Sequence, residues 1–369
     1  MFEEKTLPTI KARKRGILLI LFIGISLFVW ELGSTGLFDE TPPLFAAAAR
    51  SMHLTGDWLT PRVNGLPRFD KPPLVYWLMG LIYAMPGQET WDPLGTWSAR
   101  LPSAIASLLM MLCLGETLMN FPQGNDQFPR RTAFITSLAF ALSPLVIIWS
   151  RIAVSDALLC GTLGISLLYQ WRRYADPSRT PWWFSWVVLG LAVLTKGPVS
   201  IVITLMVLFL FSLIQKDYKR LINLIKPFNG LLITSLISFP WYLIELVIEG
   251  KPFFKSFFGY HNFQRLTSVV NSHQEPWWFF GMILLIASLP YTPFLLVGLF
   301  QEIKNLLNVN SKTICLPEDS LNKFAFSWLI SILILFTCAA TKLPSYWLPA
   351  TPAAAIMISL SPLINYSRK

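Results

Sequence analysis

VSIVITLMVLFLFSLI, residues 199–214, carries no charged side chain and ends just before Gln215 and Lys216. An uncharged apolar run of this length is typical of a helix that spans, or nearly spans, the hydrocarbon core of a bilayer. The same pattern recurs along the chain, and we predict ten membrane spans from it. They are Ile17–Leu32, Ala99–Met119, Ala133–Trp149, Ala157–Trp171, Trp182–Leu194, Val199–Ile214, Phe228–Val247, Trp277–Phe300, Phe324–Ala340 and Tyr346–Leu363.

The composition agrees with an all-α, polytopic membrane protein. The chain has 369 residues, of which 54 % are hydrophobic and 14 % are charged, and its mean hydropathy is +0.53. Soluble domains carry about 25 % charged residues. We expect one membrane-embedded domain over residues 1–369, without a separate soluble C-terminal domain, because the sequence stops just after the last span.

The net charge of +10 does not indicate nucleic-acid binding, because the basic residues fall in short runs between apolar stretches. Four cysteines without CxxC or Cys/His spacing predict neither a disulfide framework nor a thiolate metal site. The basic N-terminus continues into an apolar run without a small-residue cleavage site, which indicates a first span that is retained.

The run Leu74–Met85 is short for a crossing and is predicted to enter the membrane from the outer face without spanning it. With this assignment the basic runs sort to one side, which is then cytoplasmic together with both termini. Two long outer loops, residues 33–100 and 249–276, are rich in aromatic, proline and charged residues, and we expect them to cover one active-site cavity. A carboxylate at the bilayer centre costs about 2.5–3.5 kcal/mol, so acids kept at wet helix ends are functional candidates.

The outer motifs resemble a known family. Their order along the chain, and their position on the predicted outer side, are similar to the motifs of the polyprenyl-phosphate-sugar-dependent glycosyltransferases. These enzymes have the membrane-embedded C-type fold and include aminoarabinose transferases and protein O-mannosyltransferases. The matching residues are Asp39-Glu40, Gly56-Asp57-Trp58, Asn64-Gly65, Asp70-Lys71-Pro72-Pro73, Ser98-Ala99-Arg100-Leu101-Pro102, Arg151 with Ser155-Asp156, Thr195-Lys196-Gly197-Pro198, His261-Asn262 with Arg265, His273 with Pro276-Trp277-Trp278, and Lys342-Leu343-Pro344-Ser345-Tyr346.

The resemblance implies transfer of a sugar, with inversion, from a polyprenyl-phosphate-linked donor to a lipid, glycan or protein acceptor. The expected location is the bacterial inner membrane, with the active site on the outer face and membrane lipids, but no nucleic acid, as further partners. An oligosaccharide ligase would share the fold and the isoprenoid donor. A secondary transporter is the rival from another class, although transporters place ionisable groups near the midplane and often show repeated halves, which this sequence lacks.

The candidate catalytic residues are Asp39, Glu40 and Asp156. Asp39 matches the family acid that follows the first membrane helix, and we predict it to be the general base. The alternative is a capping role for a helix that starts near Pro42. Glu40 orients Asp39 or contacts the acceptor, and Asp156 either faces the substrate or forms an ion pair with Arg151.

Cations are needed to bind the departing phosphate. Lys71 is the leading candidate because Pro72 and Pro73 fix the chain direction behind it, although an interfacial lysine that only snorkels is the alternative. Lys196 and Lys342 share that alternative, and Arg62 and Arg265 are candidates for further phosphate contacts. Tyr346 is placed at the donor site by its motif.

In some relatives an acid and a histidine bind a divalent metal ion, and the matching residues here are Asp70 and His261. These two side chains make half a site, because most zinc sites have three or four ligands. Tyr260 also stands where relatives often carry Glu. The alternative for His261, and more so for His273, is a hydrogen-bonded packing residue.

Overall fold

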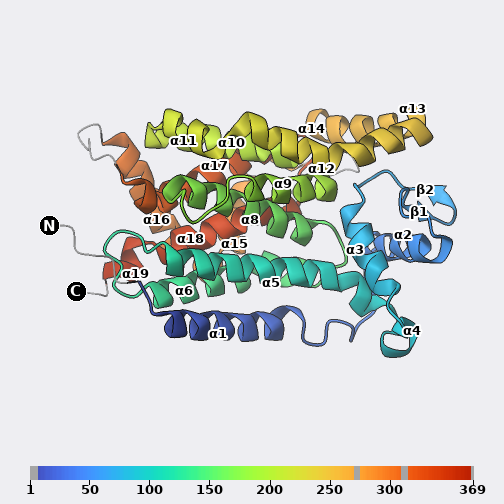
Figure 1. Ribbon diagram of the computed structural model, residues 1–369, viewed down its shortest axis with the longest axis horizontal. Helices are drawn as coiled ribbons and strands as arrows, with labels where there is room; N and C mark the ends of the chain where they lie inside the picture. The colour runs from blue at the N-terminus through green and yellow to red at the C-terminus, as the bar shows by residue number, and fades with distance from the viewer. Residues whose placement is uncertain (1–6, 270–274, 309–314, 367–369) are drawn as a thin grey trace.

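The computed structural model describes residues 7–269, 275–308 and 315–366, and helices dominate this part of the chain. Most of them lie side by side along one direction (Figure 1). The bounds are α1 Ile10–Phe28, α2 Thr41–Thr55, α3 Leu74–Tyr83, α4 Gln88–Trp91, α5 Thr96–Asn120, α6 Pro129–Ala141, α7 Pro144–Trp149, α8 Asp156–Ala175, α9 Phe184–Lys196, α10 Val199–Gln215, α11 Tyr218–Ile225, α12 Pro227–Ile248, α13 Gly250–Phe253, α14 Arg265–Thr267, α15 Phe279–Ala287, α16 Thr292–Leu307, α17 Leu321–Cys338, α18 Thr351–Ser359 and α19 Pro362–Tyr366, with the π-helix η1 Phe254–Gln264 and the 3₁₀ helices η2 Pro317–Asp319 and η3 Pro344–Ala350.

One small hairpin interrupts the helical pattern. Strand β1 (Arg62–Val63) pairs with β2 (Leu66–Pro67) in antiparallel register, with Arg62 opposite Pro67. The turn is Asn64-Gly65, with φ of 52° and 77°. Positive φ at both central residues is the requirement of a type I′ turn, which Asn-Gly meets at low cost.

The two ends of the bundle differ in what they carry. The hairpin, α2, α4 and α13 gather at the right end in Figure 1, whereas α11, α19 and the start of α1 lie at the left end. Residues of the segments 33–100 and 249–276 therefore come together at one end of the molecule. Following the side predicted from the sequence, this end is called the outer end below, and the opposite end is called the inner end.

Several predicted spans are helical but broken. The run Ala133–Trp149 divides into α6 and α7 at Ser143-Pro144, and Trp277–Phe300 divides into α15 and α16 around the cis Leu289-Pro290 bond. Tyr346–Leu363 divides into η3, α18 and α19. Proline lacks the N–H donor and disfavours helix at the residue before it, so each of these breaks has a local cause.

Helix length separates crossing from non-crossing segments. In the described part of the chain, four helical segments are long and apolar enough to cross a membrane on their own: Thr96–Asn120, Tyr218–Ile248, Leu321–Cys338 and Pro344–Ile364. Helix α3 has 10 residues. At 1.5 Å per residue it is about 15 Å long, half of a hydrocarbon core, as expected for the non-crossing run.

Small residues let the central helices approach closely. A Cβ placed on Gly161 of α8 would lie 2.7 Å from the Ala106 carbonyl oxygen of α5, and one on Gly230 of α12 would lie 2.0 Å from the Trp186 ring of α9. Because lipid tails are as apolar as the side chains, membrane helices associate through such close packing. The packed helices provide a rigid frame for the outer end.

Candidate active site

A small cavity at the outer end gathers charged residues from segments far apart in the sequence. Its volume is about 80 Å³. One part of the wall is apolar, from Leu159, Val199, Phe336, Ala339 and Pro349. The polar part consists of Asp70, Lys71, Lys196, His261, Asn262, Arg265 and Tyr346.

Lys71 is positioned by the acid before it and the prolines after it. The Asp70 carboxylate accepts hydrogen bonds from Arg68 at 2.7 Å and from the Tyr76 hydroxyl at 2.9 Å. Pro73 is the N-cap of α3, so the chain enters this helix directly after Lys71. The Lys71 ammonium donates to the Asp70 carbonyl oxygen at 2.9 Å. Residues within Arg68–Tyr76 therefore fix both the acid and the lysine.

Lys196 occupies the end of α9, where the chain turns sharply into α10. Gly197 makes this turn with φ of 93° and ψ of −165°, a conformation that is essentially reserved for glycine. The Lys196 ammonium lies 2.7 Å from the carboxylate of Asp156 in the first turn of α8, and the two side chains are each 14 % exposed. The alternative pair of Asp156 with Arg151 is not formed in the described part of the chain. The ion-pair partner of Asp156 is therefore Lys196.

The π-helix η1 and helix α14 bring His261 and Arg265 to the cavity. π-Helices are rare and often mark functional sites. The Arg265 guanidinium donates to the Tyr346 hydroxyl at 3.4 Å, and the Lys196 ammonium lies 5.1 Å from the centroid of the Tyr346 ring. Nε of Arg265 and Nδ1 of His261 are buried and have no hydrogen-bond partner among the described residues.

The charges of the cavity do not balance. Asp70 pairs with Arg68 and Asp156 pairs with Lys196, whereas Lys71 and Arg265 have no carboxylate within ion-pair distance among the described residues. A buried cation without an acid is costly unless an anion is supplied. Two such cations beside an apolar wall fit the phosphate of a lipid-linked molecule.

The pKa values follow the same electrostatics. Burial lowers the pKa of the Lys71 ammonium to about 8, with Arg265 and Lys196 adding to the effect and Asp70 opposing it. Burial, followed by the charge of Lys71, lowers the pKa of His261 to about 4, so this imidazole is neutral at pH 7. Burial alone would raise the pKa of Asp70, but Lys71 and Arg68 outweigh it, and the pKa is lowered.

The donor set does not fit a resident divalent metal ion. Both carboxylate oxygens of Asp70 already accept from Arg68 and Tyr76, and Lys71 adds a positive charge beside them. Within the described ranges, no group of three or more His, Cys, Asp or Glu side chains is placed to bind a metal. His273 lies outside the described residues. The metal site at Asp70 and His261 stays a prediction.

Asp39 and Glu40 are exposed and do not line the cavity. Asp39 has a φ of 71°, and its carboxylate accepts from the Glu40 N–H at 2.8 Å. Helix α2 has Glu40 at its N-cap position without a side-chain cap. Positive φ is uncommon outside glycine, and aspartate is one of the few other residues that tolerate it.

Two arginines hold the backbone that leads to Asp39, and the sequence alone did not show this role. The buried Arg100 guanidinium donates to the carbonyl oxygens of Leu32, Thr35 and Gly36 at 2.8, 2.8 and 2.6 Å. Arg151 donates to carbonyl oxygens at the end of α1. Their position in the outer motifs signalled importance, but the acceptors are backbone atoms, which carry no sequence signature.

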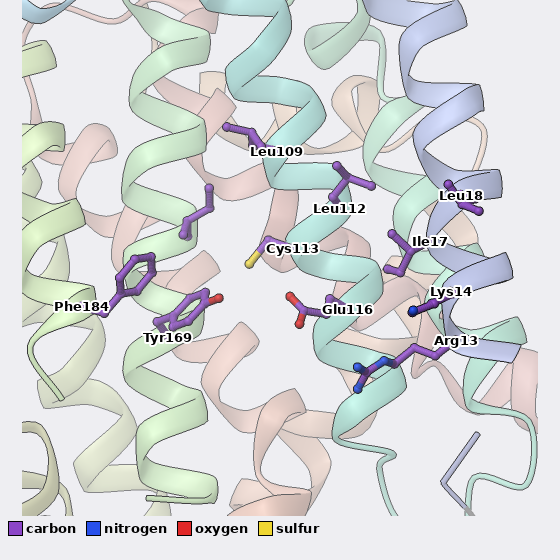
Figure 2. A pocket seen from close by; sticks show the side chains of 11 residues that line it. Arg13, Lys14, Ile17, Leu18, Leu109, Leu112, Cys113, Glu116, Tyr169 and Phe184 are labelled. Carbon is purple, nitrogen blue, oxygen red and sulfur yellow. The ribbon is translucent and has the colours of Figure 1, made fainter. Parts of the chain in front are cut away.

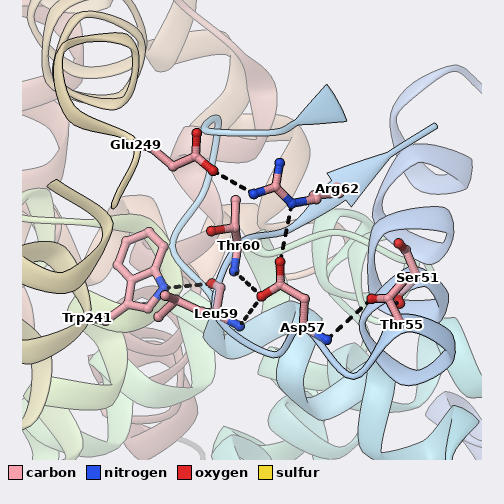
Figure 3. Close-up of polar contacts among 8 residues, drawn as sticks. All are labelled: Ser51, Thr55, Asp57, Leu59, Thr60, Arg62, Trp241 and Glu249. Carbon is pink, nitrogen blue, oxygen red and sulfur yellow. Dashed lines mark hydrogen bonds and ion pairs between the residues drawn. The ribbon is translucent and has the colours of Figure 1, made fainter. Parts of the chain in front are cut away.

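The structure does not bring Arg62 or Lys342 to the cavity wall. The Arg62 guanidinium lies between Asp57, at 3.2 Å, and Glu249, at 2.6 Å (Figure 3). These two ion pairs connect the hairpin to the C-terminal end of α12. Lys342 is buried. In the sequence it lies between Ala339 and Tyr346, which do line the cavity.

The chain is similar in sequence and in fold to known membrane glycosyltransferases. A family profile described as dolichyl-phosphate-mannose-protein mannosyltransferase matches residues 70–244. The chain is 26 % identical over 352 residues to an undecaprenyl phosphate-alpha-4-amino-4-deoxy-L-arabinose arabinosyl transferase of Pseudomonas aeruginosa (strain UCBPP-PA14), covering 94 % of this chain and 59 % of the relative. The apo crystal structure of ArnT from Cupriavidus metallidurans matches with a TM-score of 0.77 and 23 % identity, over 97 % of this chain and 62 % of that one.

The chain has the C-type glycosyltransferase fold. A more distant C-type structure, the archaeal oligosaccharyltransferase AglB from Archaeoglobus fulgidus, matches with a TM-score of 0.59 and 15 % identity over 96 % of this chain and 50 % of that one. The predicted all-α membrane fold and the predicted resemblance are thereby confirmed. The chain spans about three fifths of the length of the aminoarabinose transferases it matches.

Proposed function

We propose that this protein transfers a sugar from a polyprenyl-phosphate-linked donor to a lipid, glycan or protein acceptor. The observation that carries the proposal is the pair of cations Lys71 and Arg265, which have no ion-pair partner among the described residues and lie beside an apolar wall in a C-type glycosyltransferase fold. The ArnT crystal structure bound to undecaprenyl phosphate, with a TM-score of 0.73 and 24 % identity, supports this class of donor.

The proposed chemistry is a displacement at the anomeric carbon. An acceptor hydroxyl attacks this carbon, the bond to the phosphate oxygen breaks, and a carboxylate takes the acceptor proton. Polyprenyl phosphate leaves with the bonding electron pair. Lys71 and Arg265 stabilise the charge that develops on its phosphate, which is where cations contribute most. We assign the base role to Asp39.

We place the reaction at the outer face of the bacterial inner membrane. The support is the sorting of charges in the sequence, together with the position of α3, whose start follows the cavity residues Asp70 and Lys71, at the end of the bundle opposite the basic start of α1 (Figure 1). An oligosaccharide ligase would use the same fold and donor type, so the acceptor must be identified by experiment. A secondary transporter is disfavoured, because the unpaired cations lie at one end of the bundle and not at its middle.

The test is to incubate membranes that contain the protein with a labelled polyprenyl-phosphate sugar and to identify the labelled product by mass spectrometry. Lys71→Ala should weaken donor binding and lower turnover, each by at least tenfold, because buried phosphate charge is left unpaired, which costs on the order of 2–5 kcal/mol. Lys71→Arg should recover part of the binding. The matched control is Lys255→Ala, which removes an exposed lysine from η1.

The alternative for Lys71 is a lysine that only snorkels toward water. In that case Lys71→Ala and Lys255→Ala would both change turnover by less than about tenfold. Equal small effects in the two variants would exclude the phosphate assignment.

A further inference from the structure

A second and larger cavity lies in the inner half of the bundle, away from the candidate active site. Its volume is about 640 Å³, and it is lined by α1, α5, α8 and the start of α9 (Figure 2). Leu109 of α5 is 50 % exposed beside it, so the cavity opens toward the surface that faces lipid. None of the residues proposed for sugar transfer lines it.

The polar and apolar groups of this cavity are separated. In Figure 2, Arg13, Lys14 and Glu116 lie at its lower end, whereas Leu109 and Leu112 lie above them. From Glu116 to Leu109 the wall of α5 extends for about 10 Å at 1.5 Å per residue. The shape is therefore an apolar groove with a charged end.

The charged end is cationic. Among the described residues the wall carries one acid, Glu116, which lies 3.3 Å from the guanidinium of Arg172. This guanidinium lies over the Tyr169 ring, 4.7 Å from its centroid. Arg13 donates to the neutral amide oxygen of Asn120 at 2.7 Å, and Lys14 has no ion-pair partner within the described ranges. After Glu116 is neutralised, the charges of Arg13 and Lys14 remain uncompensated.

Depth in the bilayer determines the occupant. Arg13 and Lys14 belong to the first turns of α1, at the inner end of the bundle, where lipid headgroups of the cytoplasmic leaflet would lie. Basic pockets between membrane helices on this side bind anionic headgroups. The apolar groove above them lies at the depth of the acyl chains.

We propose that this cavity binds an anionic glycerophospholipid of the cytoplasmic leaflet, with the headgroup phosphate between Arg13 and Lys14 and an acyl chain along Leu109 and Leu112. The site is independent of the proposed sugar transfer. Its ligand differs from the polyprenyl donor in leaflet and in position.

The test is native mass spectrometry of the purified protein with phosphatidylglycerol and with phosphatidylcholine of the same acyl chains. We expect one phosphatidylglycerol to be retained in preference to phosphatidylcholine. The double variant R13Q/K14Q should weaken this retention by about 25-fold, since each cation near an anionic headgroup contributes about fivefold. The matched control is K11Q/R15Q, which removes two exposed charges from the same helix outside the cavity.

A second variant separates the groove from the charges. Leu109→Trp should fill the groove from an exposed position, leave the melting temperature unchanged and lower phosphatidylglycerol retention. Equal retention of the two lipids, or equal losses in R13Q/K14Q and K11Q/R15Q, would overturn the proposal. It would also be overturned by a bound polyprenyl phosphate that is lost in R13Q/K14Q but kept in Lys71→Ala, because that result would assign the groove to the donor lipid.

Discussion

Asp39 combines exposure, positive φ and a backbone that Arg100 holds through three carbonyl oxygens. These features suit a carboxylate that must meet an acceptor arriving from the outer side. We predict that Asp39→Asn lowers turnover by about 10²–10⁴-fold and leaves donor binding intact, because the amide keeps the shape but cannot accept a proton. Single-turnover assays and a separate donor-binding measurement check this. Glu89→Gln, which changes an exposed acid of α4 with no proposed role in transfer, is the control. Near-normal turnover in Asp39→Asn would move the base role to Glu40 or Asp156.

The lowered pKa of Lys71 predicts how donor binding depends on pH. Below about pH 8 Lys71 is mainly an ammonium and can pair with phosphate, whereas above this value it becomes a neutral amine. Because a bound phosphate favours the ammonium, donor affinity should fall as pH rises through 8, by up to about tenfold per pH unit. Lys71→Arg should show a flat profile between pH 7 and 10, since the guanidinium stays charged. A flat profile in the unmodified protein would contradict the assignment.

At the scale of elements, the turn between α9 and α10 orients Lys196. A Cβ on Gly197 would lie 3.1 Å from the Phe257 ring, and the backbone there has φ of 93°. We predict that Gly197→Ala destabilises the protein by about 1–3 kcal/mol and displaces Lys196 from Asp156. Thermal unfolding in detergent measures the loss of stability.

The control for this prediction is Gly281→Ala, because a Cβ on Gly281 of α15 meets nothing within 4 Å. Alanine is the better helix former, so this variant should be neutral or slightly more stable. Equal melting temperatures for Gly197→Ala and Gly281→Ala would show that the turn tolerates a side chain.

Elements also show where sequence reasoning succeeds. The apolar runs predicted the helices because burial in lipid requires continuous hydrophobic stretches. The breaks at Ser143-Pro144 and Leu289-Pro290 follow from prolines that are visible in the sequence, yet the runs were assigned as unbroken spans. The hairpin at Asn64-Gly65 likewise has a known local signal.

The candidate site was only partly predictable. The sequence selected Lys71, Lys196, Arg265 and Tyr346, and the structure brings all four to one cavity. Other contacts depend on the approach of segments that are distant in the sequence. They are the ion pair of Lys196 with Asp156, the ion pairs of Arg62 and the hydrogen bonds from Arg100 to carbonyl oxygens. No local pattern encodes such partners, because tertiary packing sets them.

At the scale of the whole molecule, the hairpin, α2, α4 and α13 lie at one end, and the basic start of α1 lies at the other (Figure 1). We predict that the first end faces outward and that both termini are cytoplasmic. Single cysteines at Glu89 and Gln127 test this by labelling intact cells with a membrane-impermeant maleimide. Glu89 is the better outer probe, because Gln88 is only 6 % exposed and its amide donates to the Asp92 carbonyl.

The background for this labelling should have Cys315 and Cys338 replaced by serine, because both are at least partly accessible. We expect label at position 89 in intact cells and at position 127 only after permeabilisation. Since α3 is too short to cross, the segment from Leu74 to Asp92 stays on one side of the membrane. Label at position 127 in intact cells, with none at 89, would invert the topology and place the cavity of Lys71 and Arg265 on the cytoplasmic side.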